Sequence, residues 1–276
     1  MNRRIFTYWV NPPEGLFPYI QLCVQTWFKH IPGLELIVLN HENIQEWIDN
    51  DIFNLNFNKF TMLSLPIQSD IASLLILKKH GGIFMDADTI VFKDIFVEIN
   101  ALNPEKLFVF GCANTFLIQV AIMICLQSHN RFISAMADIA LKRLNEISTV
   151  DILSYGTPTS KIQWSYFCNE IFEIVFKNEE VKNYLEILDR TETGNILESS
   201  FFTEAADSNE RYKHYVEFYF SSGVFSVKKA VEKIKFGAVS LHNSWTPSGY
   251  KKFSPEQVIA CPMMLSELIK YSLGKR

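Results

Sequence analysis

The feature that most constrains the fold is a helical pattern that runs directly into an apolar strand. Residues 65–82, LPIQSDIASLLILKKHGG, predict a helix with Pro66 near its start and two glycines at its end. Residues 83–92, IFMDADTIVF, predict one strand that is interrupted by Asp86 and Asp88. A buried strand that follows a helix in this way is typical of proteins in which both elements share one core.

The patterns before residue 65 show the same alternation. They predict a strand at 3–10, a helix at 15–33, a strand at 34–40 and a short helix at 41–50. We therefore expect an α/β fold with a central, mostly parallel sheet, which binds its ligands at the carboxyl ends of the strands. The two acids lie at such an end.

The second half of the sequence has weaker patterns. Residues 106–125 predict two buried strands, and residues 130–147 predict an amphipathic helix. The polar stretch 188–214 is the most loop-like segment, and its interpretation stays open between a mobile lid, an acceptor-side loop and a surface loop without a role. Residues 236–253 predict a last core strand that delivers His242 and Trp245 into a turn.

Membrane segments are not indicated by the sequence. The longest apolar run, residues 116–126, is shorter than the roughly twenty residues that a membrane span needs, and the N-terminus has no signal-peptide core. Residues 258–276 predict an amphipathic helix that packs on the domain, although its basic residues would suit an anionic membrane surface. We expect a cytoplasmic protein, with peripheral contact at the inner face of the membrane as the alternative.

Charge and cysteine content exclude further classes of protein. The chain of 276 residues has a formal net charge of -4 and no long run of Lys or Arg, so binding to nucleic acid is not expected. Its five cysteines are scattered and include no Cys-x-x-Cys pair. This pattern predicts reduced thiols rather than a disulfide framework or a zinc site.

Asp86 and Asp88 stand apart from the other Asp-x-Asp of the chain. Asp49 and Asp51 lie in a polar segment and are interpreted as a solvated turn, whereas Asp86 and Asp88 have apolar residues on both sides. Burying two carboxylates is costly unless a positive charge compensates them. Magnesium or manganese prefers oxygen ligands, and a metal held by one or two carboxylates keeps positions open for phosphates. The pattern predicts a nucleotide-diphosphate site.

His242 ends another apolar run, GAVSLH, and is the candidate nitrogen ligand. An imidazole beside carboxylates favours manganese over magnesium. A single histidine is more often structural than a ligand, so this assignment depends on its context.

Residues 68–92, QSDIASLLILKKHGGIFMDADTIVF, resemble the signature of glycosyltransferases with the GT-A fold. The similarity is to glycosyltransferase family 32, to the bacterial capsular polysaccharide synthesis proteins and to the clostridial glucosylating toxins. It extends in order to TYWV at 7–10 and HNSW at 242–245. The resemblance implies one Rossmann-like domain with a nucleotide-sugar-binding half at 1–130. An additional helical, acceptor-side half at 131–276 would carry the late metal ligand.

The resemblance also implies roles for individual residues. Asp88 would bind manganese, or magnesium, together with the donor diphosphate, His242 would be a further ligand, and Asp86 would bind donor hydroxyls and approach the metal. Asp70 would bind the donor sugar from the first turn of its helix, where a negative charge is favoured. The implied catalytic residues are thus Asp70, Asp86 and Asp88. The implied donor-binding residues are Trp9, Val10, Asp70, Ser73, Asp86, Ala87, Ser244, Trp245 and Lys251.

The resemblance also implies which part of the donor several of these residues would contact. Trp9 would stack near the uracil, because a large flat ring gives affinity with little loss of rotamer freedom. Ser244 and Trp245 would contact the leaving diphosphate, and Lys251 or Lys252 would add positive charge there. The partners implied are a UDP-sugar and a glycan or lipid-linked acceptor of bacterial surface polysaccharide synthesis.

Two departures from the family pattern limit what the resemblance implies. Ser73 stands where the family commonly has an arginine, so one donor contact is missing and the donor sugar cannot be assigned by analogy. The first strand lacks the usual Ile-His-x-x-Trp form, because Phe6 or Thr7 replaces the histidine.

The chemistry that the resemblance implies is transfer with retention of the anomeric configuration. The main demand is to neutralise charge on the leaving diphosphate, which a metal ion does as a Lewis acid. The leaving phosphate oxygen would accept the proton of the acceptor hydroxyl, so no general base is nominated.

Three other interpretations stay open. The chain could bind a nucleotide sugar without catalysis, because fold does not fix function. It could be a phosphatase of the haloacid dehalogenase type, whose Asp-x-Asp also ends an apolar strand. Against this, Ile90 stands where that motif has Thr or Val, and no Gly-Asp-x-x-x-Asp follows. The acids could also be solvated at a loop and have no function.

Overall fold

The structure is a computed structural model that describes residues 3–10, 16–112, 117–157, 160–202 and 207–275. The strands are β1 (Arg4–Tyr8), β2 (Glu35–Leu39), β3 (Gly82–Met85), β4 (Thr89–Val91), β5 (Leu107–Cys112), β6 (Leu117–Cys125), β7 (Leu185–Asp189) and β8 (Ala238–Ser240).

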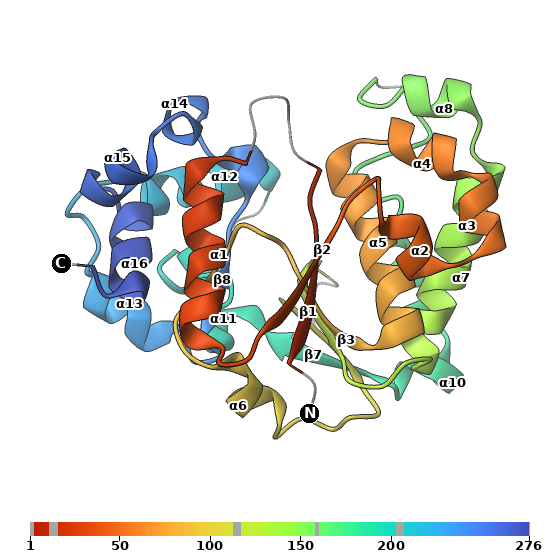
Figure 1. The fold of residues 1–276 in the computed structure, drawn as a ribbon, viewed down its shortest axis with the longest axis horizontal. Coiled ribbons are helices and arrows are strands. Elements are labelled where there is room, and N and C mark those ends of the chain that lie inside the picture. Colours follow the sequence, from red (N-terminus) through yellow and green to blue (C-terminus); the bar gives the residue numbers. More distant parts are fainter. Residues whose placement is uncertain (1–2, 11–15, 113–116, 158–159, 203–206, 276) are drawn as a thin grey trace.

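Helices cover both faces of the central sheet, which is seen between two groups of helices in Figure 1. The helices of the first half are α1 (Pro18–His30), α2 (Ile44–Ile48), α3 (Asp51–Leu55), α4 (Phe57–Met62), α5 (Leu65–His80) and α6 (Ile95–Ile99). Those of the second half are α7 (Arg131–Glu146), α8 (Thr149–Leu153), α9 (Asn169–Phe176), α10 (Glu179–Lys182), α11 (Arg190–Thr193), η1 (Glu198–Ser200), α12 (Ser208–Tyr219), α13 (Val227–Lys233), η2 (Asn243–Trp245), α14 (Ser248–Lys251), α15 (Pro255–Ala260) and α16 (Met264–Leu273).

The central sheet has six strands in the order β2-β1-β3-β6-β5-β7. The pairs β1–β2, β1–β3 and β5–β7 are parallel, and only β6 runs antiparallel to its neighbours β3 and β5. The predicted α/β class with a mostly parallel central sheet is confirmed. The carboxyl ends of β1 and β3 therefore meet at one edge of the sheet.

The core follows the alternation of side chains along the strands. Phe6 and Phe84 face the cluster that contains α5, α7 and α9, whereas Ile5 and Ile83 face a second cluster on the opposite side. A third cluster joins α1 to α12, α13 and α16. Both faces of the sheet are thus buried, as mostly parallel sheets require.

The helix before the acids ends as predicted, because Gly81 has a positive φ of 63°. A Cβ atom at this position would lie 2.9 Å from the carbonyl oxygen of Cys125 and 2.9 Å from the amide nitrogen of Ser128. Lys78, Lys79 and His80 occupy the last turn, where positive charge suits the helix dipole. Glycine therefore fixes where β3 begins.

The prediction of one strand at 83–92 is wrong. The chain turns at the two acids, where the amide of Thr89 donates a 3.1 Å hydrogen bond to the carbonyl of Asp86. After this turn β4 leaves the central sheet and pairs antiparallel with β8. The side chains of α1 hold β4 in place, since Trp27 donates to the carbonyl of Thr89 at 2.7 Å.

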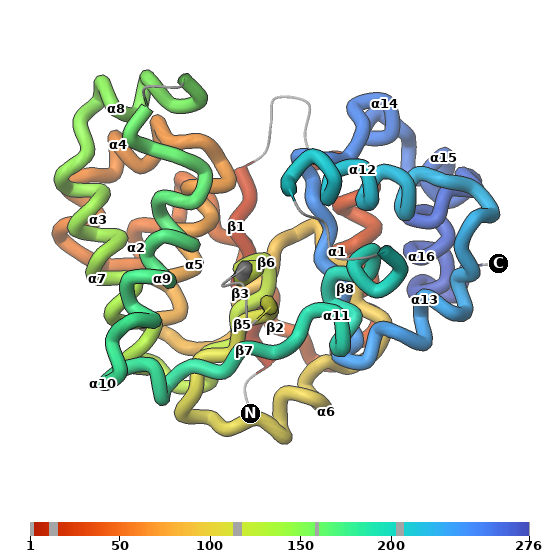
Figure 2. The backbone as a smooth tube through the Cα atoms, turned by 180° about the vertical axis from the view of Figure 1, so that it is seen from behind, coloured from red at the N-terminus to blue at the C-terminus, as the bar shows by residue number. Residues whose placement is uncertain are grey.

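The predictions for the second half need three corrections. The stretch 188–214 is not mainly a loop: it contains the end of β7, α11, η1 and the start of α12, and its residues 203–206 lie outside the described part. It packs on β8, because the amide of Ser240 donates to the carbonyl of Asn195 at 3.0 Å, and Figure 2 shows α11 beside β8. The strand in 236–253 belongs to the small sheet and not to the central one.

The third correction concerns the C-terminal segment, where α15 and α16 replace the single predicted helix. Met264, Leu265, Leu268 and Ile269 of α16 are buried in the cluster shared with α1. The apolar face therefore packs on the domain, as expected. Within the described residues, no helix combines the length and the apolar character needed to cross a membrane.

Candidate active site

The two acids, Asp86 and Asp88, directly follow the carboxyl end of β3 in the central sheet. The amide of Asp86 donates a 2.7 Å hydrogen bond to the carbonyl of Ala121 in β6, just beyond the last paired residue of β3, Met85. The carboxylate of Asp86 accepts a long bond, 3.4 Å, from the hydroxyl of Ser69 in α5. Asp86 is thus fixed by its backbone and only weakly bonded through its side chain.

Asp88 is anchored to the turn that follows β8. Asp88 is only 6% exposed. Its Oδ2 accepts a 2.8 Å hydrogen bond from the backbone amide of Asn243. Asn243 is held in turn by Tyr19 of α1, whose hydroxyl donates to Oδ1 of Asn243 at 2.6 Å. Three separate parts of the chain therefore converge on one carboxylate.

Asp70 completes a group of three acids. Burial raises the pKa of Asp70 to about 8, and burial raises the pKa of Asp88 to about 7 although the Asn243 amide and Lys251 oppose the rise. Burial also raises the pKa of Asp86 well above its ordinary value, and the charges of Asp88 and Asp70 add to it. Such shifts indicate carboxylates that lack a compensating positive charge.

In the part of the chain that the structure describes, no positive side chain is paired with these three acids. Within the residues that the structure describes, none of the ion pairs includes Asp70, Asp86 or Asp88. Lys251 acts on Asp88 at longer range, and its ammonium lies 5.5 Å from the centre of the Phe17 ring. The chemistry of the donor set therefore fits a divalent cation, because hard carboxylate oxygens are the ligands that magnesium and manganese prefer.

The helical position predicted for Asp70 is wrong in one respect. Since α5 begins at Leu65, Asp70 lies in the second turn, and the first turn contains no acid. The helix dipole acts mainly within the first turn, so it gives Asp70 little stabilisation. Ser73 is 1% exposed and donates to the carbonyl of Asp70 at 2.7 Å, so its hydroxyl is engaged within the helix.

His242, the predicted nitrogen ligand, lies close to Glu198 and to two aromatic rings. Its Nε2 lies 4.0 Å from Oε1 of Glu198, and its ring lies 4.3 Å from that of Trp245 and 5.4 Å from that of Tyr215. Burial lowers the pKa of His242 to about 4, and the charges of Arg190 and Arg211 contribute, so the imidazole is neutral at pH 7. Among the described residues, no three His, Cys, Asp or Glu side chains are gathered closely enough to hold a metal ion.

The remaining predicted residues follow the ends of three strands, β1, β3 and β8. Trp9 donates its backbone amide to Leu39 at 2.9 Å, and its indole nitrogen is buried without a hydrogen-bond partner. Ala87 is 6% exposed between the two acids, Val10 packs on the core beside α5, and Ser244 is exposed.

Sequence reasoning missed Tyr19, Asn243, Glu198 and the two arginines. Asn243 lies inside the HNSW stretch, so its position in the sequence could have indicated that it is near the site. It bonds to Asp88 through its backbone amide, however, and the residue type does not predict such a bond. Glu198 is only 5% exposed. It lies in a polar stretch, whose composition predicts exposed side chains, so its burial could not be predicted from the sequence.

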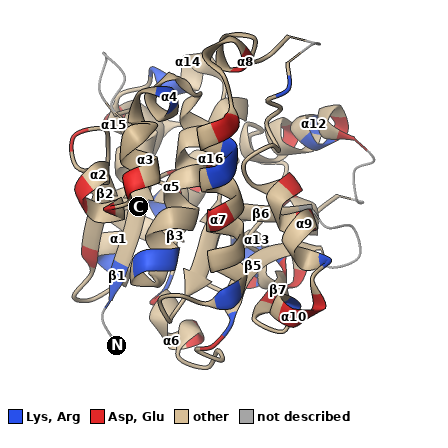
Figure 3. Ribbon diagram, turned by 90° about the vertical axis from the view of Figure 1, so that its right-hand side faces the viewer, with Lys and Arg blue, Asp and Glu red and all other residues tan. Residues whose placement is uncertain are grey.

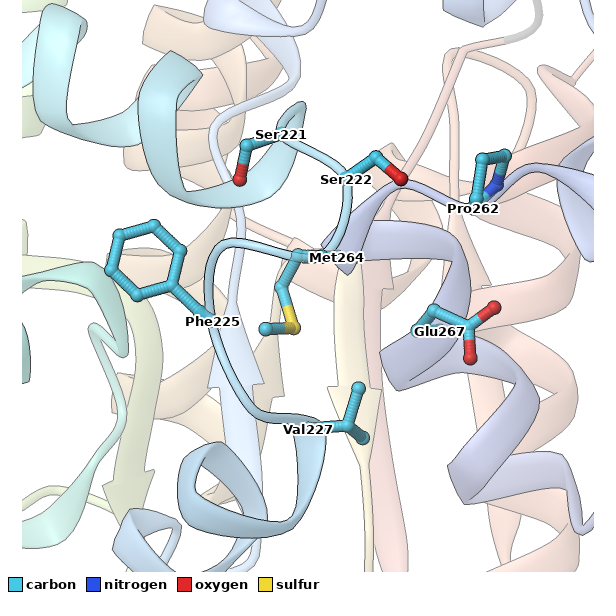
Figure 4. Close-up of a pocket in the computed structure, with 8 residues that line it drawn as sticks. Ser221, Ser222, Phe225, Val227, Pro262, Met264 and Glu267 are labelled. Carbon is cyan, nitrogen blue, oxygen red and sulfur yellow. The ribbon is translucent and has the colours of Figure 1, made fainter.

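A separate pocket lies away from these residues. It lies between the 221–227 segment and the start of α16, and Figure 4 shows Met264 and Glu267 on its helical side and Phe225 on the other. None of the predicted site residues lines it. On the face shown in Figure 3 basic and acidic residues are interspersed, and no continuous basic track is visible.

Comparisons with known proteins give one family. A family model described as "Capsular polysaccharide synthesis protein" matches residues 1–217, a range that includes Asp70, Asp86 and Asp88 and ends before His242. No curated protein matches the sequence.

The solved structures that match this chain include glycosyltransferases whose sequences have low identity to it. The PaToxG glycosyltransferase is 12% identical with a TM-score of 0.42, and the match covers 99% of this chain and 86% of that chain. The apo form of the glycosyltransferase GlyE of Streptococcus pneumoniae TIGR4 is 12% identical with a TM-score of 0.47, covering 99% and 61%. The ligand-free glycosyltransferase domain of the YGT toxin is 10% identical with a TM-score of 0.44, covering 100% and 99%.

Proposed function

Because this chain belongs to the family of capsular polysaccharide synthesis proteins, we propose that it is a glycosyltransferase that transfers a hexose from a UDP-sugar. The acceptor would be a glycan or a lipid-linked saccharide of a bacterial surface polysaccharide. One observation carries this proposal: Asp88 is buried and Asp86 half-buried just after the carboxyl end of β3, where an α/β sheet binds its ligands, and no ion pair among the described residues compensates either carboxylate.

The site has the charge that a nucleotide diphosphate and its metal ion require. A divalent cation held by Asp86 and Asp88, together with the donor phosphates, would supply Lewis-acid stabilisation of the leaving diphosphate. The cationic side chain of Lys251 acts on Asp88. It would add a further positive charge beside the phosphates.

The chain's own residues orient the donor. The Tyr19–Asn243–Asp88 connection holds the turn after β8 against the acids, and Ser244 and Trp245, the next two residues, would contact the donor diphosphate from this turn. Trp9 offers an indole N–H that is buried and unpartnered, next to the carboxyl end of β1. We assign it to the nucleoside, where the ring stacks on uracil.

Transfer with retention balances without a protein nucleophile. The bond from the anomeric carbon to the phosphate oxygen breaks, a bond to the acceptor oxygen forms on the same face, and the acceptor proton passes to the leaving diphosphate. The residues of this site then act by positioning and by charge, which are the largest contributions in such reactions.

A panel of nucleotide sugars tests the proposal. Purified protein is incubated with UDP-, GDP- and CMP-linked sugars, with manganese or with EDTA, and the released nucleotide is measured. We expect manganese-dependent release of UDP from one donor. If UDP binds in a manganese-dependent way but no donor is turned over with any acceptor preparation, the chain is a nucleotide-sugar-binding protein without catalysis. Release of inorganic phosphate from phosphate monoesters would instead favour the phosphatase.

A further inference from the structure

The amide side chain of Gln68 lies buried near the start of α5, where it is 2% exposed. Its Oε1 accepts hydrogen bonds from the hydroxyl of Tyr8 at 2.5 Å and from Nε2 of His41 at 2.7 Å. Its Nε2 donates to the carbonyls of Leu63 at 2.6 Å and Thr61 at 3.2 Å. Both lone pairs and both hydrogens of the amide are therefore used.

The partners of this amide fix its orientation. Carbonyl oxygens only accept hydrogen bonds, so the amide nitrogen of Gln68 must face the two carbonyls before α5, and its oxygen must face the other two partners. His41 therefore donates from Nε2, and Tyr8 donates from its hydroxyl. Because the loss of one partner leaves a buried polar atom unpaired, the whole group is held in a single arrangement.

The start of α5 depends on Gln68 because its N-cap residue does not hold it. Ser64, the N-cap residue, makes no side-chain bond to the helix, and within the described residues its buried hydroxyl has no partner. Gln68, one turn further along, instead bonds back to the carbonyls of the segment before the helix. Helix ends fray when such contacts are missing, so this side chain fixes where the first two turns of α5 lie.

The same side chain connects the end of β1 to the acids. Tyr8 is the last residue of β1 and directly precedes Trp9. On the helix, Ser69 follows Gln68 and donates to the carboxylate of Asp86 at 3.4 Å. A displacement of α5 against β1 would therefore move the helix residues that face the acids relative to Trp9.

We propose that Gln68 is a positioning residue that sets the spacing between Trp9 and Asp70 and thereby determines which donor sugar is accepted. This inference rests on the proposed glycosyltransferase function, in which Trp9 contacts the nucleoside and Asp70 the sugar of one donor molecule. Gln68 contacts neither part of the donor and acts through these two residues. A displacement of about 1 Å can change a rate by up to a hundred-fold, so the two contacts need a fixed spacing.

A second buried amide, Asn130, provides a matched control. It is 6% exposed, its Nδ2 donates to the carbonyls of Glu105 and Tyr184, and its Oδ1 accepts from two backbone amides of α7. It lies beside the starts of β5 and β7, at the end of the sheet opposite the acids. Gln68→Met and Asn130→Leu each replace such an amide by an apolar side chain of similar size, and Tyr8→Phe removes a single bond of the Gln68 group.

The test measures donor preference, because a loss of folded protein lowers all rates by the same factor and leaves their ratio unchanged. UDP release is followed with manganese and UDP-glucose, UDP-galactose, UDP-N-acetylglucosamine or UDP-glucuronic acid, and UDP affinity is measured by calorimetry. We expect the ratio of kcat/KM between the best and the second-best donor to fall about ten-fold in Gln68→Met and about three-fold in Tyr8→Phe, with UDP affinity within about two-fold. Asn130→Leu should keep the ratio of the unaltered protein.

The result that overturns this inference differs from the one that overturns the proposed function. An unchanged ratio in Tyr8→Phe and in folded Gln68→Met, or an equal fall in Asn130→Leu, would overturn the positioning role. A loss of UDP affinity at an unchanged ratio would also overturn it, because the group would then shape only the nucleoside site. If the unaltered protein neither binds UDP nor releases it from any donor, the proposed function fails, and the inference that rests on it fails as well.

Discussion

The backbone amide of Asn243 donates a 2.8 Å hydrogen bond to Oδ2 of Asp88, across 155 positions of sequence. This contact joins the turn after β8 to the acids at the end of β3. It brings the C-terminal HNSW stretch, which lies beyond the region matched by the family model, to the site formed by the matched region. The site therefore depends on both halves of the chain.

Tyr19→Phe tests whether this connection positions the site. The substitution removes the 2.6 Å hydrogen bond to Oδ1 of Asn243 and leaves that acceptor unpaired. We expect UDP release to fall about ten-fold, with a loss of stability of about 0.5–1.5 kcal/mol. Tyr271→Phe is the matched control, because Tyr271 is 56% exposed on α16. Equal activity of the two variants would show that the connection has no role in positioning.

Gly81→Ala tests how the start of β3 is fixed. Gly81 and Gly33 have similar positive φ values, 63° and 70°, but only Gly81 lacks room for a Cβ atom. Chemical denaturation should show that Gly81→Ala is less stable than Gly33→Ala by at least about 1 kcal/mol, since both substitutions place alanine at a positive φ and only Gly81→Ala adds a clash. Equal losses would contradict the close approach to the carbonyl of Cys125.

The raised pKa values of the acids predict how stability changes with pH in the metal-free protein. The pKa is about 7 for Asp88 and about 8 for Asp70 in the folded state, against about 3.9 for an unfolded aspartate. Because the folded state binds these protons more tightly, their contribution to stability is complete below pH about 4 and is lost as the pH rises through 7 to 8.

Thermal denaturation in EDTA between pH 5 and pH 8.5 measures this dependence. We expect the melting temperature to fall as the pH rises, and Asp88→Asn to reduce the slope. Asp49→Asn, at the exposed Asp-x-Asp, should leave the slope unchanged. Manganese at the upper end of this range should restore the melting temperature, because a ligand that binds only the folded state stabilises it. A flat profile would mean that the acids are solvated.

The first half of the fold could be predicted from the sequence because its elements are strongly periodic and are punctuated by glycine. The helix before Gly81, the strands β1 and β2, and the start of β3 are therefore predicted correctly. The turn at Asp86 and Asp88 was missed, since the apolar residues on both sides continue the strand pattern and only the pairing of β4 with β8 breaks it.

The acceptor side could not be predicted for a different physical reason. Polar residues at 188–214 indicate a loop when local composition is considered, but Asn195 and Glu198 are buried by packing against β8. Likewise, no local pattern connects Tyr19 with Asn243, which are 224 positions apart. Long-range contacts of this kind decide which polar side chains reach the site.

Metal-dependent sugar transfer by this protein should depend on Asp88. The most direct measurement is the rate of UDP release from the preferred UDP-sugar, with manganese and with EDTA, for the unaltered protein, Asp88→Asn and Asp49→Asn. We expect manganese-dependent release that falls by at least about a hundred-fold in Asp88→Asn and persists in Asp49→Asn, with all three proteins folded. Full, manganese-dependent release by Asp88→Asn would contradict the assignment of this carboxylate to the metal and the donor diphosphate.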